Sequence, residues 1–176
     1  FLMIIILTLF SFLVIFLNVS KGGYIQGKHY ISSQERKLKQ MPYPDLVEYS
    51  KGLEHCIHPE YLEEQLNESL DALQVPCIDV YLLHNPEYFK LASQNQGLSL
   101  EDTNKQYYDR IKKAFIYLEE QVKLGRIQYY GISSNTFVHS HLAFDHTSLD
   151  HCLAIADEIS NDHHFNVVQL PCNLFE

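Results

Sequence analysis

The chain carries a set of polar and ionisable side chains at the ends of short apolar segments: Lys21, His84, Ser133, Ser134, Asn135 and Gln169. A lysine and a histidine that face one pocket can polarise a carbonyl group, the lysine through its charge and the histidine as a hydrogen-bond donor. Serine, asparagine and glutamine are uncharged donors and acceptors, suited to holding an amide or a similar planar group in one orientation. These residue types predict a site that orients and polarises a carbonyl compound.

The position of His84 follows from the segment before it. Residues 78–83 are apolar and rich in residues that favour strands, which is typical of a strand buried on both faces. Asn85 and Pro86 end this strand. His84 therefore lies at a strand end, at the mouth of a loop.

Strands and helices alternate along the chain. The predicted strands are residues 14–19, 78–83, 127–132 and 165–170. The predicted helices begin at His58-Pro59-Glu60, cover residues 111–122, and follow a cap at Thr147 or Ser148. Such alternation predicts an α/β fold with a parallel sheet, in which all strand ends lie on one face and the polar residues converge.

Two segments lack apolar periodicity. Residues 22–57 contain several glycines and prolines and are predicted to be a long surface loop, and residues 93–104 a polar loop. The tyrosines of the first segment are expected to cover the surface.

Length and charge limit the class of protein. The 176 residues can bury a core, but a complete α/β barrel usually has roughly 250 residues. Thirteen lysines and arginines against 22 acidic residues give a net charge of -9, which argues against a nucleic-acid partner. The four cysteines, Cys56, Cys77, Cys152 and Cys172, form no Cys-x-x-Cys pair. They are expected to be core thiols in a reducing, cytoplasmic compartment, and the ten histidines match no metal-binding motif.

The first 17 residues are strongly apolar and allow two interpretations. They are just long enough to span a membrane, without the basic region or cleavage site of a secretory signal. Alternatively, residues 14–19 form a buried strand that ends in Ser20-Lys21-Gly22-Gly23. This strand leaves only about 13 residues ahead of it, too few to span a membrane as a helix. On this interpretation residues 1–14 are a hydrophobic leader.

Four motifs, in order, resemble the aldo-keto reductases. They are Ser20-Lys21-Gly22-Gly23-Tyr24, Asp-Val-Tyr-Leu-Leu-His-Asn-Pro-Glu at 79–87, Gly125-Arg126-Ile127 with Tyr-Gly-Ile-Ser-Ser-Asn at 130–135, and Val-Val-Gln-Leu-Pro-Cys-Asn-Leu at 167–174. The resemblance covers residues 15–176. It implies a partial (β/α)8 TIM barrel, roughly strands three to six with their helices, from an enzyme that reduces aldehydes or ketones with NADPH, or oxidises alcohols in reverse.

The resemblance also implies roles for individual residues. Lys21 resembles the active-site lysine on barrel strand three, and His84 the histidine after strand four. Ser133, Asn135 and Gln169 resemble the residues that bind the nicotinamide carboxamide, and Ser134 is an alternative to Asn135.

The chain departs from the family pattern before Lys21. In the family a tyrosine general acid and an aspartate come from that region, and residues 1–20 contain neither. We therefore expect an incomplete chain of an NADP-dependent oxidoreductase that acts on a small carbonyl substrate. The alternative is a catalytically silent nicotinamide-binding or regulatory protein, associated with a membrane through residues 1–17.

Overall fold

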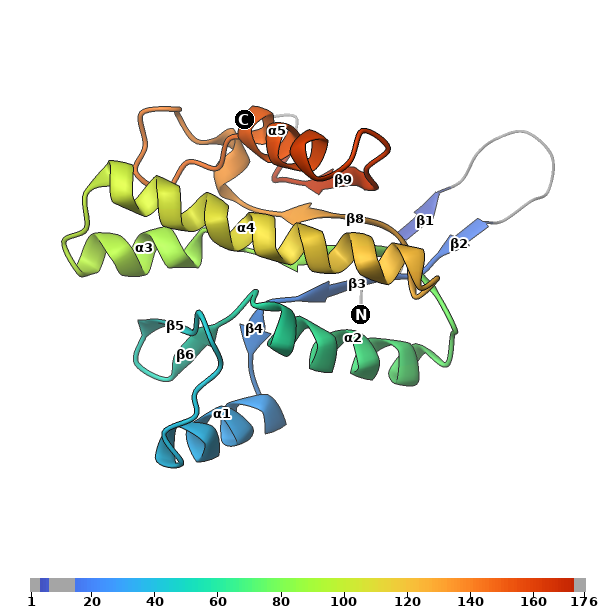
Figure 1. Ribbon diagram of the computed structural model, residues 1–176, viewed down its shortest axis with the longest axis horizontal. Helices are drawn as coiled ribbons and strands as arrows, with labels where there is room; N and C mark the ends of the chain where they lie inside the picture. Colours follow the sequence, from blue (N-terminus) through green and yellow to red (C-terminus); the bar gives the residue numbers. More distant parts are fainter. Residues whose placement is uncertain (1–3, 7–14, 173–176) are drawn as a thin grey trace.

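The computed structural model describes residues 4–6 and 15–172 of the chain, and a parallel sheet of four strands lies at its centre (Figure 1). The strands, in their order across the sheet, are β3 (Val19–Gly22), β7 (Ile78–His84), β8 (Ile127–Ser133) and β9 (Phe165–Gln169). The connecting helices are α2 (Pro59–Leu73), α3 (Tyr88–Asn95), α4 (Leu100–Lys123) and α5 (Leu149–Ile159). The predicted α/β fold with a parallel sheet is confirmed, and the arrangement is consistent with a partial (β/α)8 barrel.

The register of the sheet aligns the strand ends. His84 pairs with Ser133, and Ser133 pairs with Gln169. Lys21 pairs with Leu82, two residues before His84. Paired residues point to the same face and the side-chain period of a strand is two, so Lys21, His84, Ser133 and Gln169 share one face of the sheet.

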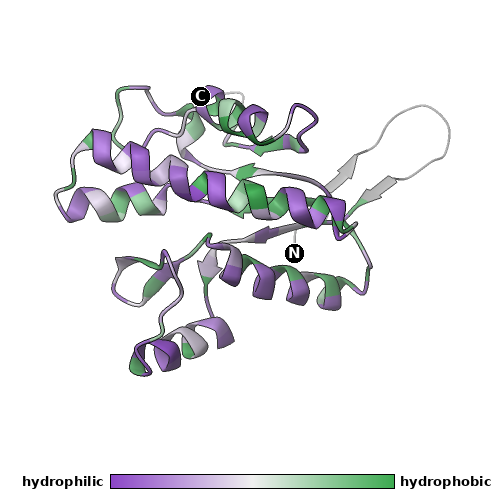
Figure 2. Ribbon diagram, in the orientation of Figure 1, coloured by the Kyte–Doolittle hydropathy of each residue, from purple (hydrophilic) through white to green (hydrophobic). Residues whose placement is uncertain are grey.

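The other face of the sheet packs against the helices. Tyr81 and Leu83 of β7 and Tyr130 and Ile132 of β8 are fully buried in the main hydrophobic core. Hydrophobic and hydrophilic residues alternate around α2 and α4, as amphipathic helices require (Figure 2).

Helix α2 begins as predicted. His58 is its N-cap and accepts a hydrogen bond from the backbone N–H of Glu60 (3.3 Å), while Pro59 is the first helical residue. Leu62 and Leu66, on the predicted apolar face, are fully buried.

The predicted polar loop at residues 93–104 is wrong, because two helices occupy most of it. Helix α3 extends to Asn95, and α4 begins at Leu100, well before the predicted residue 111. Ser99 caps α4 by accepting a hydrogen bond from the N–H of Asp102 (3.1 Å). The first turns of α4 are mostly polar, so apolar periodicity could not reveal them. For α5, Ser148 rather than Thr147 is the cap.

The predicted loop at residues 22–57 is also wrong. It contains β4 (Tyr24–Ile25), α1 (Lys28–Leu38), β5 (Val47–Ser50) and β6 (Leu53–His55), and β4, β6 and β5 form a small antiparallel sheet. The buried residues of α1 are His29 and Ser33, so this helix has no apolar stripe to detect. A separate core of Ile25, Tyr43, Cys56 and Tyr61 holds the segment together.

At the N-terminus, β1 (Ile4–Ile6) pairs antiparallel with β2 (Ile15–Leu17). The predicted strand at 14–19 is therefore divided between β2 and β3, and Lys21 lies inside β3 instead of in a turn after it. Val14 and most of the leader at 1–14 lie outside the described residues. No helix in the part of the chain that the structure describes has the length and apolar character to cross a membrane.

The cysteines differ in burial. Cys56 and Cys152 are buried, as expected of core thiols, and Cys77 is partly exposed. Cys172 is exposed, so the prediction of a core thiol is wrong there, because the residue follows the end of β9.

Candidate active site at the strand ends

Lys21 links three strands through side-chain hydrogen bonds. Its Nζ donates to Ser133 Oγ (3.3 Å) and to Gln169 Oε1, and Ser133 Oγ also donates to Gln169 Oε1 (2.9 Å). Strands β3 and β9 are separated by β7 and β8, so in a flat sheet they would lie roughly 14 Å apart. The direct contact between Lys21 and Gln169 therefore requires the sheet to curl as a barrel wall does.

Charge and burial determine the protonation of this cluster. Burial lowers the pKa of Lys21 from its ordinary value. Burial and, secondarily, the positive charge of Lys21 lower the pKa of His84 to about 4. His84 is therefore a neutral imidazole at pH 7, with one N–H to donate.

Main-chain and aromatic contacts position His84. The His55 Nε2 atom is 2.7 Å from the His84 main-chain oxygen, a hydrogen bond in which the imidazole donates. His55 is itself buried, and burial lowers its pKa to about 4. The ring of Tyr24 lies edge-on to the His84 ring, with 4.7 Å between the ring centroids.

Gly23 makes this arrangement possible. Its φ of +145° is rare for residues with side chains, and an added Cβ would lie 2.6 Å from His55 Nε2 and 2.8 Å from the His84 oxygen. The Gly23 N–H donates to Gln65 Oε1 (3.2 Å). The turn after β3 is thus packed directly against the end of β7.

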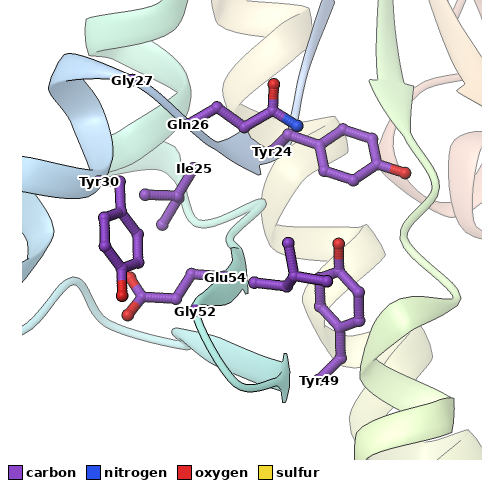
Figure 3. A pocket seen from close by; sticks show the side chains of 9 residues that line it. Tyr24, Ile25, Gln26, Gly27, Tyr30, Tyr49, Gly52 and Glu54 are labelled. Atoms are coloured by element: carbon purple, nitrogen blue, oxygen red, sulfur yellow. The ribbon is translucent and has the colours of Figure 1, made fainter.

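A cavity of about 550 Å³ adjoins Lys21 and His84. Its remaining lining residues are Tyr24, Gln26, His29, Gln65 and Glu68. Tyr24 and Gln26 also line a neighbouring hollow of about 450 Å³, in which Tyr30 and Tyr49 stand on opposite sides (Figure 3). The candidate site therefore opens towards the small antiparallel sheet.

A chain of tyrosines forms one wall. The Tyr24 hydroxyl donates to the Tyr88 hydroxyl (2.8 Å), and the Tyr88 ring stacks on Tyr49 with centroids 4.0 Å apart. Burial, followed by the Tyr88 hydrogen bond, raises the pKa of Tyr24. Sequence reasoning missed the placement of Tyr24, His55 and Gln65 at the site, although the position of Tyr24 three residues after Lys21 was a usable signal.

Ser134 and Asn135 lie outside the hydrogen-bonded cluster. Ser134 is buried, and its Oγ accepts a hydrogen bond from the Thr136 N–H (3.1 Å). The Asn135 N–H donates to Glu87 Oε1 (3.1 Å), and the Asn135 side chain is exposed. Of the six predicted site residues, the structure brings together Lys21, His84, Ser133 and Gln169.

Comparisons with known proteins agree with the motifs. A family model described as the Aldo/keto reductase family matches residues 36–170. The chain is 32% identical over 96 residues to an NAD(P)H-dependent D-xylose reductase from Scheffersomyces stipitis, covering 51% of this chain and 30% of that reductase.

Two solved structures resemble the fold over part of their length. A glycerol dehydrogenase from Gluconobacter oxydans has a TM-score of 0.44 and 19% identity, over 70% of this chain and 27% of that enzyme. An aldo-keto reductase from Bacillus halodurans, in its holo form, has a TM-score of 0.36 and 21% identity, over 67% and 26% of the two chains.

The family model covers well over half of the chain, and its match includes the second and third motifs and the start of the fourth. This chain belongs to the aldo/keto reductase family.

Proposed function

We propose that this chain contributes the lysine and histidine of an active site that reduces aldehydes or ketones with NAD(P)H, or oxidises alcohols in reverse. The observation that carries the proposal is the cluster of Lys21, Ser133 and Gln169 on the same face of the sheet as His84. Membership of the aldo/keto reductase family supports the reaction class.

Lys21 and His84 have complementary roles in this proposal. A neutral His84 donates its N–H to the carbonyl oxygen and orients it, while the Lys21 charge stabilises the negative charge that develops there. Desolvation strengthens both interactions because the local dielectric constant is lower than that of water.

Ser133 and Gln169 suit a nicotinamide carboxamide. A hydroxyl and a primary amide supply both donors and acceptors, which matches the two polar atoms of a carboxamide. The cofactor supplies the hydride when bound, and these side chains fix the orientation of its ring. Asn135 is exposed beside them and Ser134 already bonds to Thr136, so we propose Asn135 ahead of Ser134 as a third partner.

The remaining parts of the proposal rest on the family resemblance. We propose NADP(H) as the cofactor, residues 15–176 as the barrel portion, residues 1–14 as a separate leader, and a cytoplasmic location.

The test is to add NADPH and a panel of aldehydes to the purified full-length protein that contains this chain and to follow the absorbance of NADPH. We expect carbonyl-dependent oxidation, reduced roughly 10²- to 10³-fold in His84→Ala, the range typical for loss of one hydrogen-bond donor to a developing oxyanion. His141→Ala, which changes an exposed histidine, is the matched control and should retain activity.

Cofactor binding is measured separately by NADPH fluorescence. Binding without turnover would favour the catalytically silent alternative. If NADPH does not bind, or His84→Ala matches the unsubstituted protein, the proposal is wrong.

A further inference from the structure

A second lysine, on the helix that follows β7, is almost completely buried. Lys90 of α3 is 2% exposed, and its Nζ donates to Asn104 Oδ1 (2.7 Å) and to the His146 main-chain oxygen (2.5 Å). The ammonium also lies 4.7 Å from the centroid of the Tyr107 ring. Through these two bonds Lys90 connects α3 to the start of α4 and to the loop that precedes α5. Figure 1 shows α3 and α4 side by side.

The charge of Lys90 has no directly paired carboxylate among the described residues. No described Asp or Glu oxygen lies within 4.0 Å of its Nζ. Asp145 is the acidic residue whose charge affects Lys90, but its Oδ1 lies 3.1 Å from His139 Nδ1. A buried cation without a counter-ion is costly, and lysine is rarely buried unless it is paired.

A cavity of about 310 Å³ adjoins Lys90, and its lining is rich in hydrogen-bond donors. The polar lining residues besides Lys90 are Asn104, Tyr108, His141, His146, Ser148 and His151. We refer to this cavity as the Lys90 pocket. His146 Nδ1 is a buried atom with no hydrogen-bond partner among the described residues. Such an atom in a native protein calls for a water or an ion.

The start of α5 adds positive potential. Ser148 is its N-cap, and Ser148 and His151 line the pocket, so the pocket lies beside the positive end of the helix dipole. His151 is held in place by stacking on Tyr108, with 3.8 Å between ring centroids. Asp150 in the same first turn opposes this potential, but it does not line the pocket.

We propose that the Lys90 pocket binds the phosphate group of a small molecule. A lysine with an unused N–H, three imidazoles and a helix N-terminus approach the pocket from different elements. A tetrahedral dianion can accept hydrogen bonds from several directions at once, whereas a monocarboxylate has two oxygens in one plane and half the charge. Inorganic phosphate and a phosphomonoester share this chemistry.

The test measures binding to the purified protein without NADPH or a carbonyl compound, so it does not depend on the proposed function. Inorganic phosphate, glycerol phosphate and acetate are titrated at constant ionic strength, by calorimetry and by the ring-proton NMR signals of histidine. We expect saturable phosphate binding that shifts the His146 and His151 signals. The stronger of the two phosphate ligands identifies the source of the group.

Lys90→Met should weaken phosphate binding at least tenfold, since it removes the buried cation. Lys112→Met is the matched control, because Lys112 lies on α4 and pairs with Glu158 away from the pocket (2.6 Å). His151→Phe preserves stacking on Tyr108 but removes the imidazole nitrogens, so it should weaken binding severalfold even if Lys90→Met fails to fold. The proposal is wrong if phosphate binding is not saturable, survives both substitutions, or is matched by acetate.

Discussion

Lys21 and Lys90 are both partly or fully shielded from solvent, but their surroundings differ. Lys21 contacts the side chains of Ser133 and Gln169 at the edge of an open cavity. Lys90 is enclosed by Asn104, a main-chain oxygen and the Tyr107 ring. Burial lowers the pKa of both, that of Lys90 to about 8.

The comparison shows that burial alone does not define a lysine's role. The partners of Lys21 are side-chain hydroxyl and amide groups of a kind that can also bond to a ligand, and a neutral histidine shares its face of the sheet. The partners of Lys90 hold three elements together and leave one N–H free. These differences support the two proposals, that Lys21 acts on a carbonyl group and that Lys90 binds an anion.

The largest effect is predicted for the NADPH-dependent activity, which should depend on Lys21 and not on Lys90. Lys21→Met removes the charge that we propose to stabilise the carbonyl oxygen, so we expect NADPH-dependent turnover to fall roughly 10²- to 10³-fold. Steady-state kinetics measures this change, with Lys112→Met as the control. The same Lys21→Met protein should bind phosphate normally, and a parallel loss of phosphate binding would break the distinction.

The second prediction concerns acid stability. His55 is fully buried with a pKa of about 4, whereas an unfolded histidine titrates near 6.5. The unfolded state therefore binds protons first, and stability that is complete above pH 6.5 is lost as the pH falls towards 4. His55 contributes up to about 3 kcal/mol to this loss.

His55→Gln keeps a donor for the His84 oxygen but cannot titrate. Denaturant unfolding between pH 7 and 4 should show a shallower loss of stability in this variant, with His141→Gln as the exposed control. His84, whose pKa is also lowered to about 4, contributes with the same sign. An unchanged pH profile would show that His55 is not the titrating group.

A smaller effect is expected from Gly23→Ala. The new Cβ would meet His55 and the His84 oxygen, and alanine is strained at the φ of Gly23, so we expect destabilisation of about 1–3 kcal/mol. Turnover should fall because the end of β7 must move. Gly97→Ala is the control, because Gly97 also has a positive φ but no atom lies within 4 Å of an added Cβ. Its loss of stability measures the backbone strain alone, without a steric clash.

The smallest effect should come from Lys90→Met in phosphate-free buffer. The substitution relieves the cost of a buried charge, but it leaves Asn104 Oδ1 and the His146 main-chain oxygen without their donor. These effects oppose each other, so we expect the free energy of unfolding to change by no more than about 2 kcal/mol. Thermal unfolding with and without phosphate measures it. A strong destabilisation would indicate that Lys90 acts mainly through its bonds to Asn104 and His146.

Local patterns predicted strands β7, β8 and β9 and helices α2 and α5 well, but placed the first strand of the parallel sheet at residues 14–19 instead of Val19–Gly22. Their apolar residues recur at the period of the element that buries them, and His58-Pro59 and Ser148 mark two helix starts. The same reasoning failed for α1, whose buried residues are polar, and for α3 and the first turns of α4. The periodicity of apolar residues does not reveal a helix whose buried side chains are polar.

The sequence by itself determined the alternation of strands and helices, the family motifs, and the placement of His84, Ser133 and Gln169 at the ends of parallel strands. Only the tertiary structure decided that the sheet curls enough for Lys21 to reach Gln169, that Tyr24 and His55 meet His84, and that Lys90 is buried beside a cavity. These contacts join residues far apart in the chain, and they depend on the curvature of the sheet and the packing of loops, which no local pattern encodes.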